Sequence, residues 1–189
     1  GPDGKWTVPN PGDLTDGQTV TATATDPAGN ISLPGTALVD TVAPTVTVTA
    51  ALTNDSTPPL TGTVNDPAAK VVVTVDGVNY PATNNGDGTW TLADNTLPAL
   101  TDGPHNVTVT ATDPAGNVGT TTGVLNVDTV APTVTLSDVL TNDSTPPLTG
   151  TVNDPTAKVV VTVDGVNYQA VNNGNGTWTL ADNTLPVLA

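Results

Sequence analysis

The residues best able to do chemistry in this sequence are aspartates, and most of them lie in predicted loops. All 18 acidic residues of the 189-residue chain are Asp, and Asp40, Asp66 and Asp113 occupy three separate loops. We expect these loops to meet at one end of a β-sandwich, where three carboxylates would repel one another unless a cation lay among them. Carboxylate, carbonyl and water oxygens are the ligands that Ca²⁺ prefers. The sequence therefore predicts a calcium site at this end.

The same reasoning extends the candidate set along the chain. Asp128 and Asp154 repeat the pattern at a later position, and Asp26 stands where Asp113 stands in a second copy of the motif DPAGN. Two second-rank candidates lie in loops expected at the opposite end of the sandwich. The full set of predicted Ca²⁺ ligands is Asp40, Asp66, Asp113, Asp128, Asp154, Asp26 and, in the second rank, Asp55 and Asp102.

An alternative is ordinary turn chemistry, because Asp beside Pro or Gly is common in turns. Asp76 and Asp164 belong to that alternative, since each precedes Gly in a two-residue hairpin turn. Asp87 is replaced by Asn175 in the next copy, so it is not a ligand candidate. The EF-hand spacing of calcium ligands is missing, and the calcium prediction therefore depends on the expected loop geometry.

The charge balance excludes two classes of partner. The net charge is −15, and only Lys5, Lys70 and Lys158 accompany the carboxylates. Nucleic acid binding requires Lys or Arg to displace counterions, and an anionic membrane surface attracts basic segments. No stretch is apolar and long enough to span a bilayer. We therefore expect neither nucleic acid binding nor membrane insertion of this chain.

Catalytic groups are scarce. His105 is the only His, and Gln18 occupies the corresponding place in the first copy. The Ser residues stand beside Pro or turn residues, with no His and acid arranged for nucleophilic catalysis. The chain has no Cys, which excludes disulfides, thiolate metal sites and Cys nucleophiles. The sequence predicts a protein that is not an enzyme.

The elements that must position these residues are β-strands. Gly and Pro number 18 each, Thr and Val alternate in short runs, and Phe and Met are missing. Thr, Val, Asp, Gly and Pro are poor helix formers, whereas alternating β-branched residues favour strands. The composition predicts an all-β fold.

An 88-residue repeat organises the chain. The segment that begins DTVAPTVT at Asp40 recurs from Asp128, and residues 3–30 match residues 87–117. Repeats of this length indicate tandem domains. We therefore divide the chain into the C-terminal part of one repeat at 1–39 (the end of strand E and strands F and G), a complete repeat at 40–127, and the N-terminal part of a further repeat at 128–189 (strands A to E).

Alternation and turn signals predict seven strands, A to G, in the complete repeat. They are 45–49, 60–64, 71–75, 78–83, a strand containing Trp90 and Leu92, 106–112, and a last strand that ends near Val127. Seven short strands of this kind predict a fold of tandem immunoglobulin-like β-sandwich repeats.

Strand parity assigns the faces of these strands. Val107 and Val109 alternate with Thr, so we expect the Val side chains to point inward and the Thr side chains to point toward solvent. Each repeat contains one Trp, namely Trp6, Trp90 or Trp178, and we expect it at the centre of the core.

The ordered motifs DTVAP, NDSTPPLTGTV, VTVDG, DGTWTL and TDGPHNVTVTATDPAGN resemble the bacterial immunoglobulin-like (Big) repeats of giant, type I-secreted, RTX-type surface adhesins. The resemblance covers essentially the whole chain. It implies β-sandwiches strung in long arrays, an extracellular location at the bacterial cell surface, and Ca²⁺ at the domain junctions.

We interpret the chain as a structural extender, or spacer, of such an adhesin, with neighbouring repeats of the same adhesin as partners. Near-identical copies favour spacing over recognition. The alternative is an adhesive module that binds glycan or ice, because Thr runs such as TVTVT at 45–49 can order water on a flat sheet. Here the runs belong to separate, twisted strands, which weakens the ice-binding alternative.

The partial repeats predict head-to-tail strand complementation between chains, because each would leave strand edges and an apolar face open. The N-terminal strands of one chain would complete the C-terminal partial repeat of another, so that Trp178 shares a core with Val20 of its neighbour. Asp26 would then join Asp128 and Asp154 in a composite cation site. Cleavage of a longer polypeptide would give the same contacts, and that alternative stays open.

Overall fold

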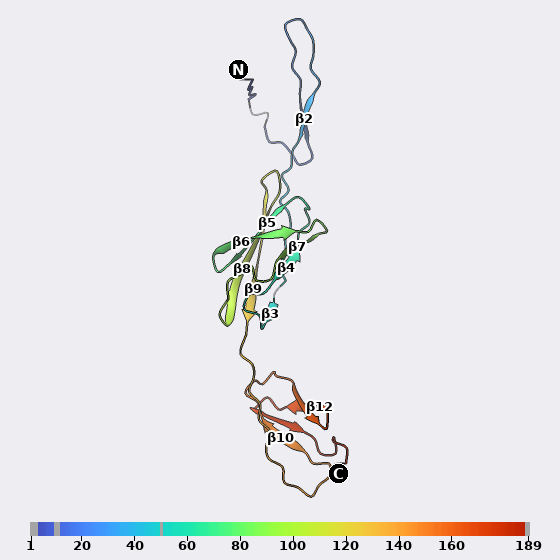
Figure 1. The fold of residues 1–189 in the computed structure, drawn as a ribbon. Helices are drawn as coiled ribbons and strands as arrows, with labels where there is room; N and C mark the ends of the chain where they lie inside the picture. The colour runs from blue at the N-terminus through green and yellow to red at the C-terminus, as the bar shows by residue number, and fades with distance from the viewer. Residues whose placement is uncertain (1–3, 10–11, 50, 188–189) are drawn as a thin grey trace. The chain divides into compact units, whose positions relative to one another are not determined.

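The computed structural model describes residues 4–9, 12–49 and 51–187 (Figure 1). Within these ranges the chain forms β-strands and no helix, which confirms the all-β prediction. The same ranges accordingly hold no helix that is long and apolar enough to cross a membrane. The chain divides into two compact units, residues 1–129 and 130–189.

The first part of unit 1 is a single β-hairpin. β1 (Thr19–Ala22) pairs antiparallel with β2 (Gly35–Leu38), and these are the predicted strands F and G of the first repeat. Trp6 is 67% exposed, so the prediction that it lies in a core is wrong for this chain. The physical reason is that the described residues before Asp40 provide no second sheet to cover the indole.

The complete repeat contains seven strands, close to those predicted. Their hydrogen-bonded order is β3–β9–β8–β5–β6–β7–β4, and β6 pairs with β5 through its first part and with β7 through its last two residues. The continuous sheet therefore turns over at β6 to enclose a core. The strands are β3 (Ala51–Thr53), β4 (Leu60–Thr63), β5 (Lys70–Val75), β6 (Val78–Asn84), β7 (Thr89–Leu92), β8 (Gly103–Thr112) and β9 (Val118–Val127).

The predicted strand at 45–49 is present only as a short run of bonds to β4. Val46 forms an isolated bridge with Val64, and the N–H of Thr47 donates to the carbonyl oxygen of Thr63 at 2.9 Å. From Ala51 onward the chain pairs with β9 instead, and that pairing is parallel. The first strand of the sandwich is thus divided between the two edges of the sheet, since its first part bonds to β4 and its last part to β9. The sequence did not predict this division.

The core of the complete repeat is centred on Trp90, which is fully buried inside the folded seven-stranded sheet. Its indole Nε1 donates to the carbonyl oxygen of Thr47 at 2.8 Å, so the buried polar atom is satisfied. Val107, Val109 and Ala111 are buried on β8, which confirms the predicted parity, although the Thr residues between them are half-buried rather than fully exposed.

Unit 2 contains β10 (Leu148–Thr151), β11 (Val159–Val163), β12 (Val166–Asn172) and β13 (Thr177–Leu180), in the order β10–β13–β12–β11. Trp178 is buried there among Val152, Val159, Leu180 and Leu185. This partial repeat therefore has a small core of its own. The opposite side of that core is open: Val134 is 60% exposed, whereas the corresponding Val46 of the complete repeat is 8% exposed.

Candidate functional site

The loops that carry the predicted calcium ligands of the complete repeat meet beside the incoming linker, residues 39–45. The N–H of Thr45 donates to Oδ1 of Asn65, in the loop between β4 and β5, at 2.8 Å. Nδ2 of Asn117, in the loop between β8 and β9, donates to the main-chain oxygen of Asp40 at 3.0 Å. Both loops therefore lie at the end of the sandwich where the linker arrives, as the sequence predicts.

Asp113 is the most enclosed of the candidate ligands, with 7% exposure. Its Oδ1 accepts the N–H groups of Gly116 and Asn117 at 2.7 and 2.8 Å, and its Oδ2 accepts Nδ2 of Asn117 at 2.8 Å. Burial acts to raise the pKa of Asp113, but the bonds from Asn117 and Gly116 outweigh it and hold the pKa below its usual value. The turn therefore holds an ionised carboxylate at neutral pH.

Asp66 and Asp154 occupy equivalent loops in the complete and the C-terminal repeats. Oδ1 of each accepts the N–H two residues further along, at 2.8 Å for Asp66 and 2.7 Å for Asp154. The main-chain oxygens of the two residues accept Nδ2 of Asn84 and Asn172 respectively, at 2.9 Å. These contacts are those of an Asx turn, the alternative that the sequence left open.

Asp40 and Asp128 occupy the same place in the two linkers, and both are exposed. Oδ1 of Asp40 accepts the N–H of Val42 at 3.1 Å. The N–H of Asp128 donates to the carbonyl oxygen of Thr53 at 2.9 Å, directly after the end of β9. Both linker aspartates therefore lie at the surface, each in a short linker that follows a strand pairing.

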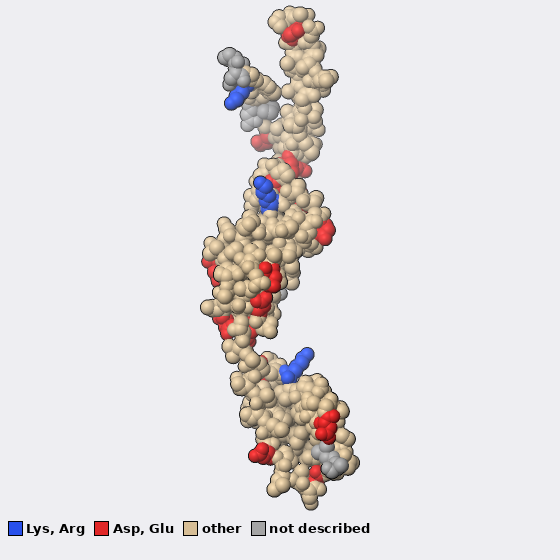
Figure 2. Space-filling model, in the orientation of Figure 1, with Lys and Arg blue, Asp and Glu red and all other residues tan. Residues whose placement is uncertain are grey.

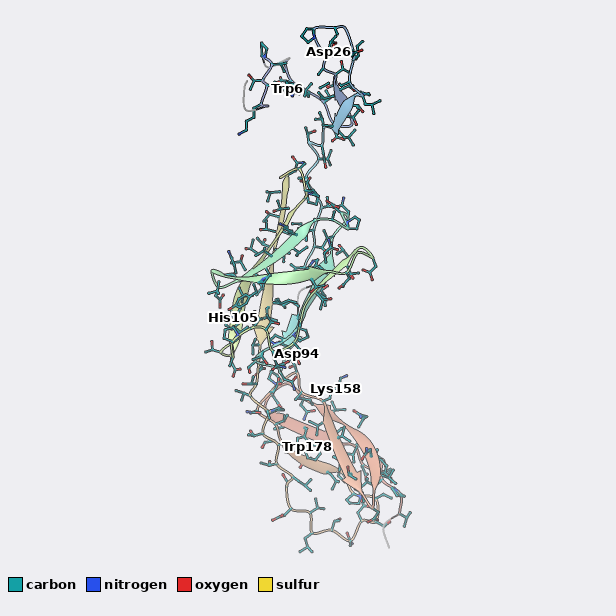
Figure 3. The ribbon with its side chains drawn as sticks, turned by 45° about the horizontal axis from the view of Figure 1, so that its top comes forward. Trp6, Asp26, Asp94, His105, Lys158 and Trp178 are labelled. Carbon is teal, nitrogen blue, oxygen red and sulfur yellow. The ribbon has the colours of Figure 1, made fainter. Side chains whose placement is uncertain are left out.

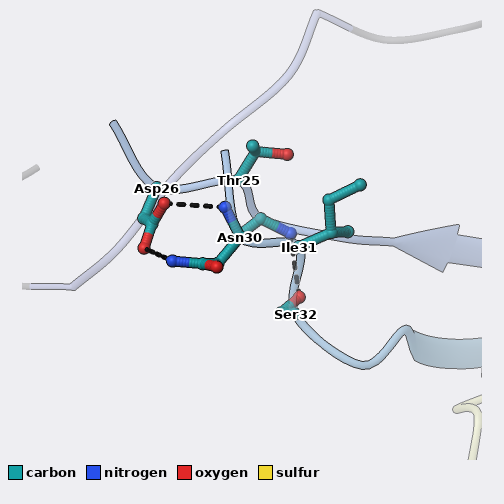
Figure 4. Close-up of a pocket in the computed structure, with 6 residues that line it drawn as sticks. Thr25, Asp26, Asn30, Ile31 and Ser32 are labelled. Carbon is teal, nitrogen blue, oxygen red and sulfur yellow. Dashed lines mark hydrogen bonds between the residues drawn. The ribbon is translucent and has the colours of Figure 1, made fainter. Parts of the chain in front are cut away.

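Asp26 is caged in the same way as Asp113, in a turn of the same sequence. Its Oδ1 accepts the N–H of Ala28 at 2.9 Å. Figure 4 shows the two bonds from Asn30, whose N–H donates to Oδ1 at 2.8 Å and whose Nδ2 donates to Oδ2 at 2.7 Å. The side-chain and backbone bonds from Asn30 lower the pKa of Asp26. A shallow surface hollow beside this turn is bordered by the exposed Ile31.

Asp55 and Asp102 lie at the other end of the complete repeat. Oδ1 of Asp55 accepts the N–H of Thr57 at 2.8 Å. Oδ1 of Asp102 accepts both the N–H and the hydroxyl of Thr129 at 2.8 Å, and these bonds lower the pKa of Asp102. The second-rank candidates thus contact the loop and the outgoing linker at that end.

His105 joins two loops at this same end (Figure 3). Its Nε2 faces the carbonyl oxygen of Thr101 at 2.7 Å, and its Nδ1 contacts Oδ2 of Asp76 in the β5–β6 turn. Both ring nitrogens face oxygen acceptors, so the protonated ring can donate twice. The Thr101 carbonyl and the Asp76 carboxylate raise the pKa of His105, and the bond from His105 lowers the pKa of Asp76.

The described residues include no group of three or more His, Asp or Glu side chains arranged to hold a metal ion. The donor chemistry nevertheless suits Ca²⁺, because the carboxylate of Asp113 and the main-chain oxygen of Asp40 are both bonded to Asn117 and are hard oxygen ligands. The calcium site therefore stays a prediction, and the structure shows only that Asn117 bonds to both Asp40 and Asp113.

The surface is strongly acidic. On the face drawn in Figure 2, the Asp side chains are spread over both units, and the Lys side chains are few and far from one another. Lys70 is the first residue of β5 and pairs with Thr112 of β8. Thr112 directly precedes Asp113 in the sequence. The three Lys balance three of the 18 Asp charges, which leaves the net charge of −15.

Sequence reasoning missed the residues that organise this site. Asn117, Asn65 and Asn84 hold the two loops and the linker together, and Asp16 contacts the linker after the first repeat. The signal available was their position: each Asn stands in a motif that recurs in a second copy, DPAGN, NDP or NNG. These amides are neutral, so charge alone does not identify them.

The fold and this arrangement of loops define an immunoglobulin-like β-sandwich module joined to its neighbours by short linkers. The bacterial Ig-like domain family matches residues 34–129, and the chain belongs to that family. The family is one of β-sandwich modules and not of enzymes. A comparison with curated proteins gave no match.

Three solved structures are similar to the chain. One is a tetra-tandem repeat in the extending region of a large adhesion protein, with 26% identity, a TM-score of 0.43, and coverage of 90% of this chain and 49% of that one. The second is a Ca²⁺-stabilized adhesin that helps an Antarctic bacterium reach out and bind ice, with 27% identity, a TM-score of 0.35, and coverage of 85% and 47%.

The third is a 1.5-MDa bacterial ice-binding adhesin studied for its retention at the host cell surface, with 24% identity, a TM-score of 0.40, and coverage of 85% and 61%. The chain thus spans about half of the first two of these structures and less than two thirds of the third.

Proposed function

We propose that the chain is a spacer region of a bacterial cell-surface adhesin, located outside the cell, whose repeats hold a distant binding region away from the surface. The division into a partial repeat at 1–39, a complete repeat at 40–127 and a partial repeat at 128–189 is part of this proposal. Membership of the bacterial Ig-like family and the near-identity of the copies support it.

The observation that carries the proposal is the repeated anchoring of the incoming linker. The N–H of Thr45 donates to Oδ1 of Asn65 at 2.8 Å, and the N–H of Thr133 donates to Oδ1 of Asn153 at the same distance. In the complete repeat the linker also passes so close to β9 that a Cβ on Gly119 would lie 1.7 Å from the carbonyl oxygen of Pro44. A linker docked on its own repeat, with Pro restricting its φ, suits a spacer.

Length measurements on concatenated copies of residues 40–127 test the proposal. β8 and β9 contain ten residues each, which is about 33 Å of strand. We expect each added copy to lengthen the molecule by roughly 35–45 Å, including the linker. Small-angle scattering or atomic force microscopy of two, four and eight copies should give a linear increase. Growth as the square root of copy number, typical of a flexible chain, would contradict rigid spacing.

We propose further that Ca²⁺ binds at the linker-proximal end of each repeat and stiffens the junction. The chain's own contribution would be the Asp113 carboxylate and the Asp40 main-chain oxygen, with Asp66 supplied by the neighbouring loop. The bound ion would supply positive charge to carboxylates that have few cations nearby. Isothermal titration of the chelated protein with Ca²⁺ tests this proposal, and Asp113→Asn should weaken binding while Asp76→Asn, in a distant turn, should not.

The partners in this proposal are neighbouring repeats of the same kind. The open side of unit 2 exposes apolar residues that the complete repeat covers with β8 and β9, and the hairpin at the N-terminus exposes Val20, whose counterpart Val107 is buried. In a longer polypeptide the adjoining sequence would supply the missing strands. For the 189-residue polypeptide we propose head-to-tail complementation, in which the N-terminal hairpin of a second copy covers unit 2.

Sedimentation velocity over a hundredfold range of concentration tests the complementation. We expect association that Val20→Asp weakens and that the control Thr21→Asp, on the opposite face of β1, leaves unchanged, because a charge on the apolar face must be desolvated. A chain that remains monomeric throughout would overturn the complementation without affecting the spacer proposal.

A further inference from the structure

Both repeat exits in unit 1 carry the same contact between a carboxylate and the outgoing linker. Oδ1 of Asp102 accepts the N–H and the hydroxyl of Thr129, each at 2.8 Å. Oδ1 of Asp16 accepts the N–H of Thr41 at 2.9 Å. Each Asp stands in the sequence TDG, and each Thr stands in the linker sequence VDTVAP. The contact is therefore a recurring property of the repeat.

The backbone ladder ends just before these contacts. At the second exit, Val127 is the last residue of β9, opposite Gly103 of β8, and the N–H of Asp128 donates to the carbonyl oxygen of Thr53 at 2.9 Å. At the first exit, the N–H of Val39 donates to the carbonyl oxygen of Gln18 at 2.9 Å. In both places the carboxylate holds the residue two positions beyond the last Val of the backbone ladder, Val39 or Val127.

We infer that Asp16 and Asp102 are linker-positioning residues, whose carboxylates fix the direction in which the chain leaves each repeat. The inference rests on the proposed spacer function, because a fixed exit matters only where the spacing of repeats matters.

The first linker illustrates how little freedom remains. Thr41 is held by Asp16 of the repeat behind it, and Thr45 is held by Asn65 of the repeat ahead. Only three residues lie between them, which can span about 10–14 Å from one anchored Cα to the next, and one of the three is Pro44. Without the Asp contact, the free segment would begin two residues earlier.

Positioning the linker differs chemically from binding calcium, the role that the sequence predicts for Asp102. A hydrogen-bond acceptor can be an amide oxygen as well as a carboxylate oxygen, so Asp102→Asn should keep much of the contact to Thr129. A calcium ligand loses its charge in the same substitution and with it most of its affinity. Asp102→Ala removes both functions.

Amide hydrogen exchange of Thr129, measured by NMR on the full chain in the presence of chelator, tests the inference directly. We expect Asp102→Ala to speed this exchange by roughly tenfold or more, because a hydrogen bond to a charged group is lost. Asp102→Asn should retain most of the protection. The matched control is Asp94→Ala at the same end of the repeat, because the Asp94 side chain bonds only to Asn95.

A second readout measures the junction itself. The chain has no Cys, so spin labels can be placed on Thr122→Cys and Gln169→Cys, two exposed positions on either side of the second linker. Pulsed electron paramagnetic resonance should give a broader distance distribution for Asp102→Ala than for the parent and for Asp102→Asn, with no change for Asp94→Ala. If Asp102→Ala unfolds the repeat, Asp16→Ala with exchange at Thr41 provides an independent variant.

The outcomes separate the two proposals. If Asp102→Ala changes neither Thr129 exchange nor the distance distribution while the parent distribution is narrow, the positioning role is wrong and the spacer function survives. If Asp102→Asn behaves like Asp102→Ala and only in the presence of Ca²⁺, Asp102 is a metal ligand instead and the inference is overturned. A broad parent distribution even with Ca²⁺ overturns the spacer function and the positioning role together.

Discussion

Replacing Gly62 with Ala should disrupt the contact that closes the core of the complete repeat. Gly62 lies on β4 opposite Trp90 of β7, and a Cβ added there would lie 2.0 Å from the carbonyl oxygen of Thr47 and 2.6 Å from Nε1 of Trp90. The nearest obstacle is backbone, which cannot rotate away as a flexible side chain can. The first strand or the indole must therefore shift, and the 2.8 Å bond between Trp90 and Thr47 must lengthen or break.

The expected loss of stability follows from these two effects. Overpacking a core by one methyl group typically costs about 1–3 kcal/mol. Leaving the buried indole N–H without an acceptor costs about 1–3 kcal/mol more. Because relaxation that relieves one effect worsens the other, we expect a net loss of about 2–4 kcal/mol for Gly62→Ala. This is a large part of the ~5–15 kcal/mol that stabilises a typical domain.

Hydrogen exchange followed by mass spectrometry can measure this loss in the full chain. Peptides from 60–92 that include Ala68, Pro81 or Asp87 differ in sequence from their counterparts in unit 2 and therefore report the complete repeat separately. The matched control is Gly123→Ala, where the added Cβ meets Cγ1 of Val48, a side-chain atom, at 2.7 Å. That contact can be relieved by rotation about the Val48 side chain, so we expect a smaller effect. Equal protection in Gly62→Ala and the parent would refute the close-packing argument.

Four further outcomes are expected. The pKa of His105 is raised in the folded state, so protonation of His105 stabilises the repeat fully below about pH 6.5. This stabilisation is lost as the pH rises through the folded pKa, at up to about 1.4 kcal/mol per pH unit. Thermal melts of His105→Gln should lack this pH dependence. The pKa of Asp76 is lowered, so its contribution to the stability of the repeat is lost only as the pH falls and the carboxylate is protonated. Asp76→Asn should therefore reduce the dependence of the melting temperature on pH. Removing Ca²⁺ with chelator should lower the melting temperature, since one site at a hundred times its dissociation constant adds about 2.7 kcal/mol, and an unchanged melting temperature would count against calcium binding. Gly119→Ala should displace Pro44 and speed amide exchange at Thr45, whereas Gly35→Ala, whose Cβ would meet nothing closer than 3.9 Å, should not.

The strands of the complete repeat could be predicted because strand periodicity is local. Alternation of Val with Thr identifies β8, and Val107, Val109 and Ala111 are buried as the parity requires. The Asp76–Gly77 turn between β5 and β6 was predictable for the same reason, since Asp76 adopts a positive φ of 48° that suits a tight hairpin. Each of these features is decided by a few adjacent residues.

The first strand and the first Trp could not be predicted in the same way. Whether Ala51 pairs with β4 or with β9 depends on which sheet edge is vacant, and that is a property of the assembled sandwich. Trp6 stands in DGKWTV, a motif similar to the DGTWTL of Trp90, but is exposed, because burial requires a second sheet and not a motif. Pattern reading assigns an inward face, and long-range packing decides whether anything covers it.

The candidate site was predictable to the level of loops but not of contacts. The sandwich topology places the loops of Asp40 and Asp113 at one end, and the structure joins them through Asn117. The amide contacts could not be predicted from charge, because Asn is neutral. Where a carboxylate is already held by N–H donors, as Asp113 is, turn formation and ion binding need not compete, since a turn that fixes an ionised carboxylate also presents it to a cation.

Comparison of the two copies indicates that the half of the sandwich around the Trp forms without the half that contains β8 and β9. Trp178 donates to the carbonyl oxygen of Thr135 at 2.9 Å, as Trp90 donates to that of Thr47, and Asn172 repeats the loop contact of Asn84. The described residues of unit 2 keep these contacts without strands equivalent to β8 and β9, so the half around the Trp is specified by its own sequence. The apolar face that β8 and β9 cover in the complete repeat does not form independently in this way. Its counterpart in unit 2, which includes Val134, stays exposed. Covering that face links strands far apart in sequence, and such non-local contacts form late and slowly. We therefore expect hydrogen exchange in the complete repeat to be fastest in β9 and slowest around Trp90, and the opposite order would show that the two halves form as one.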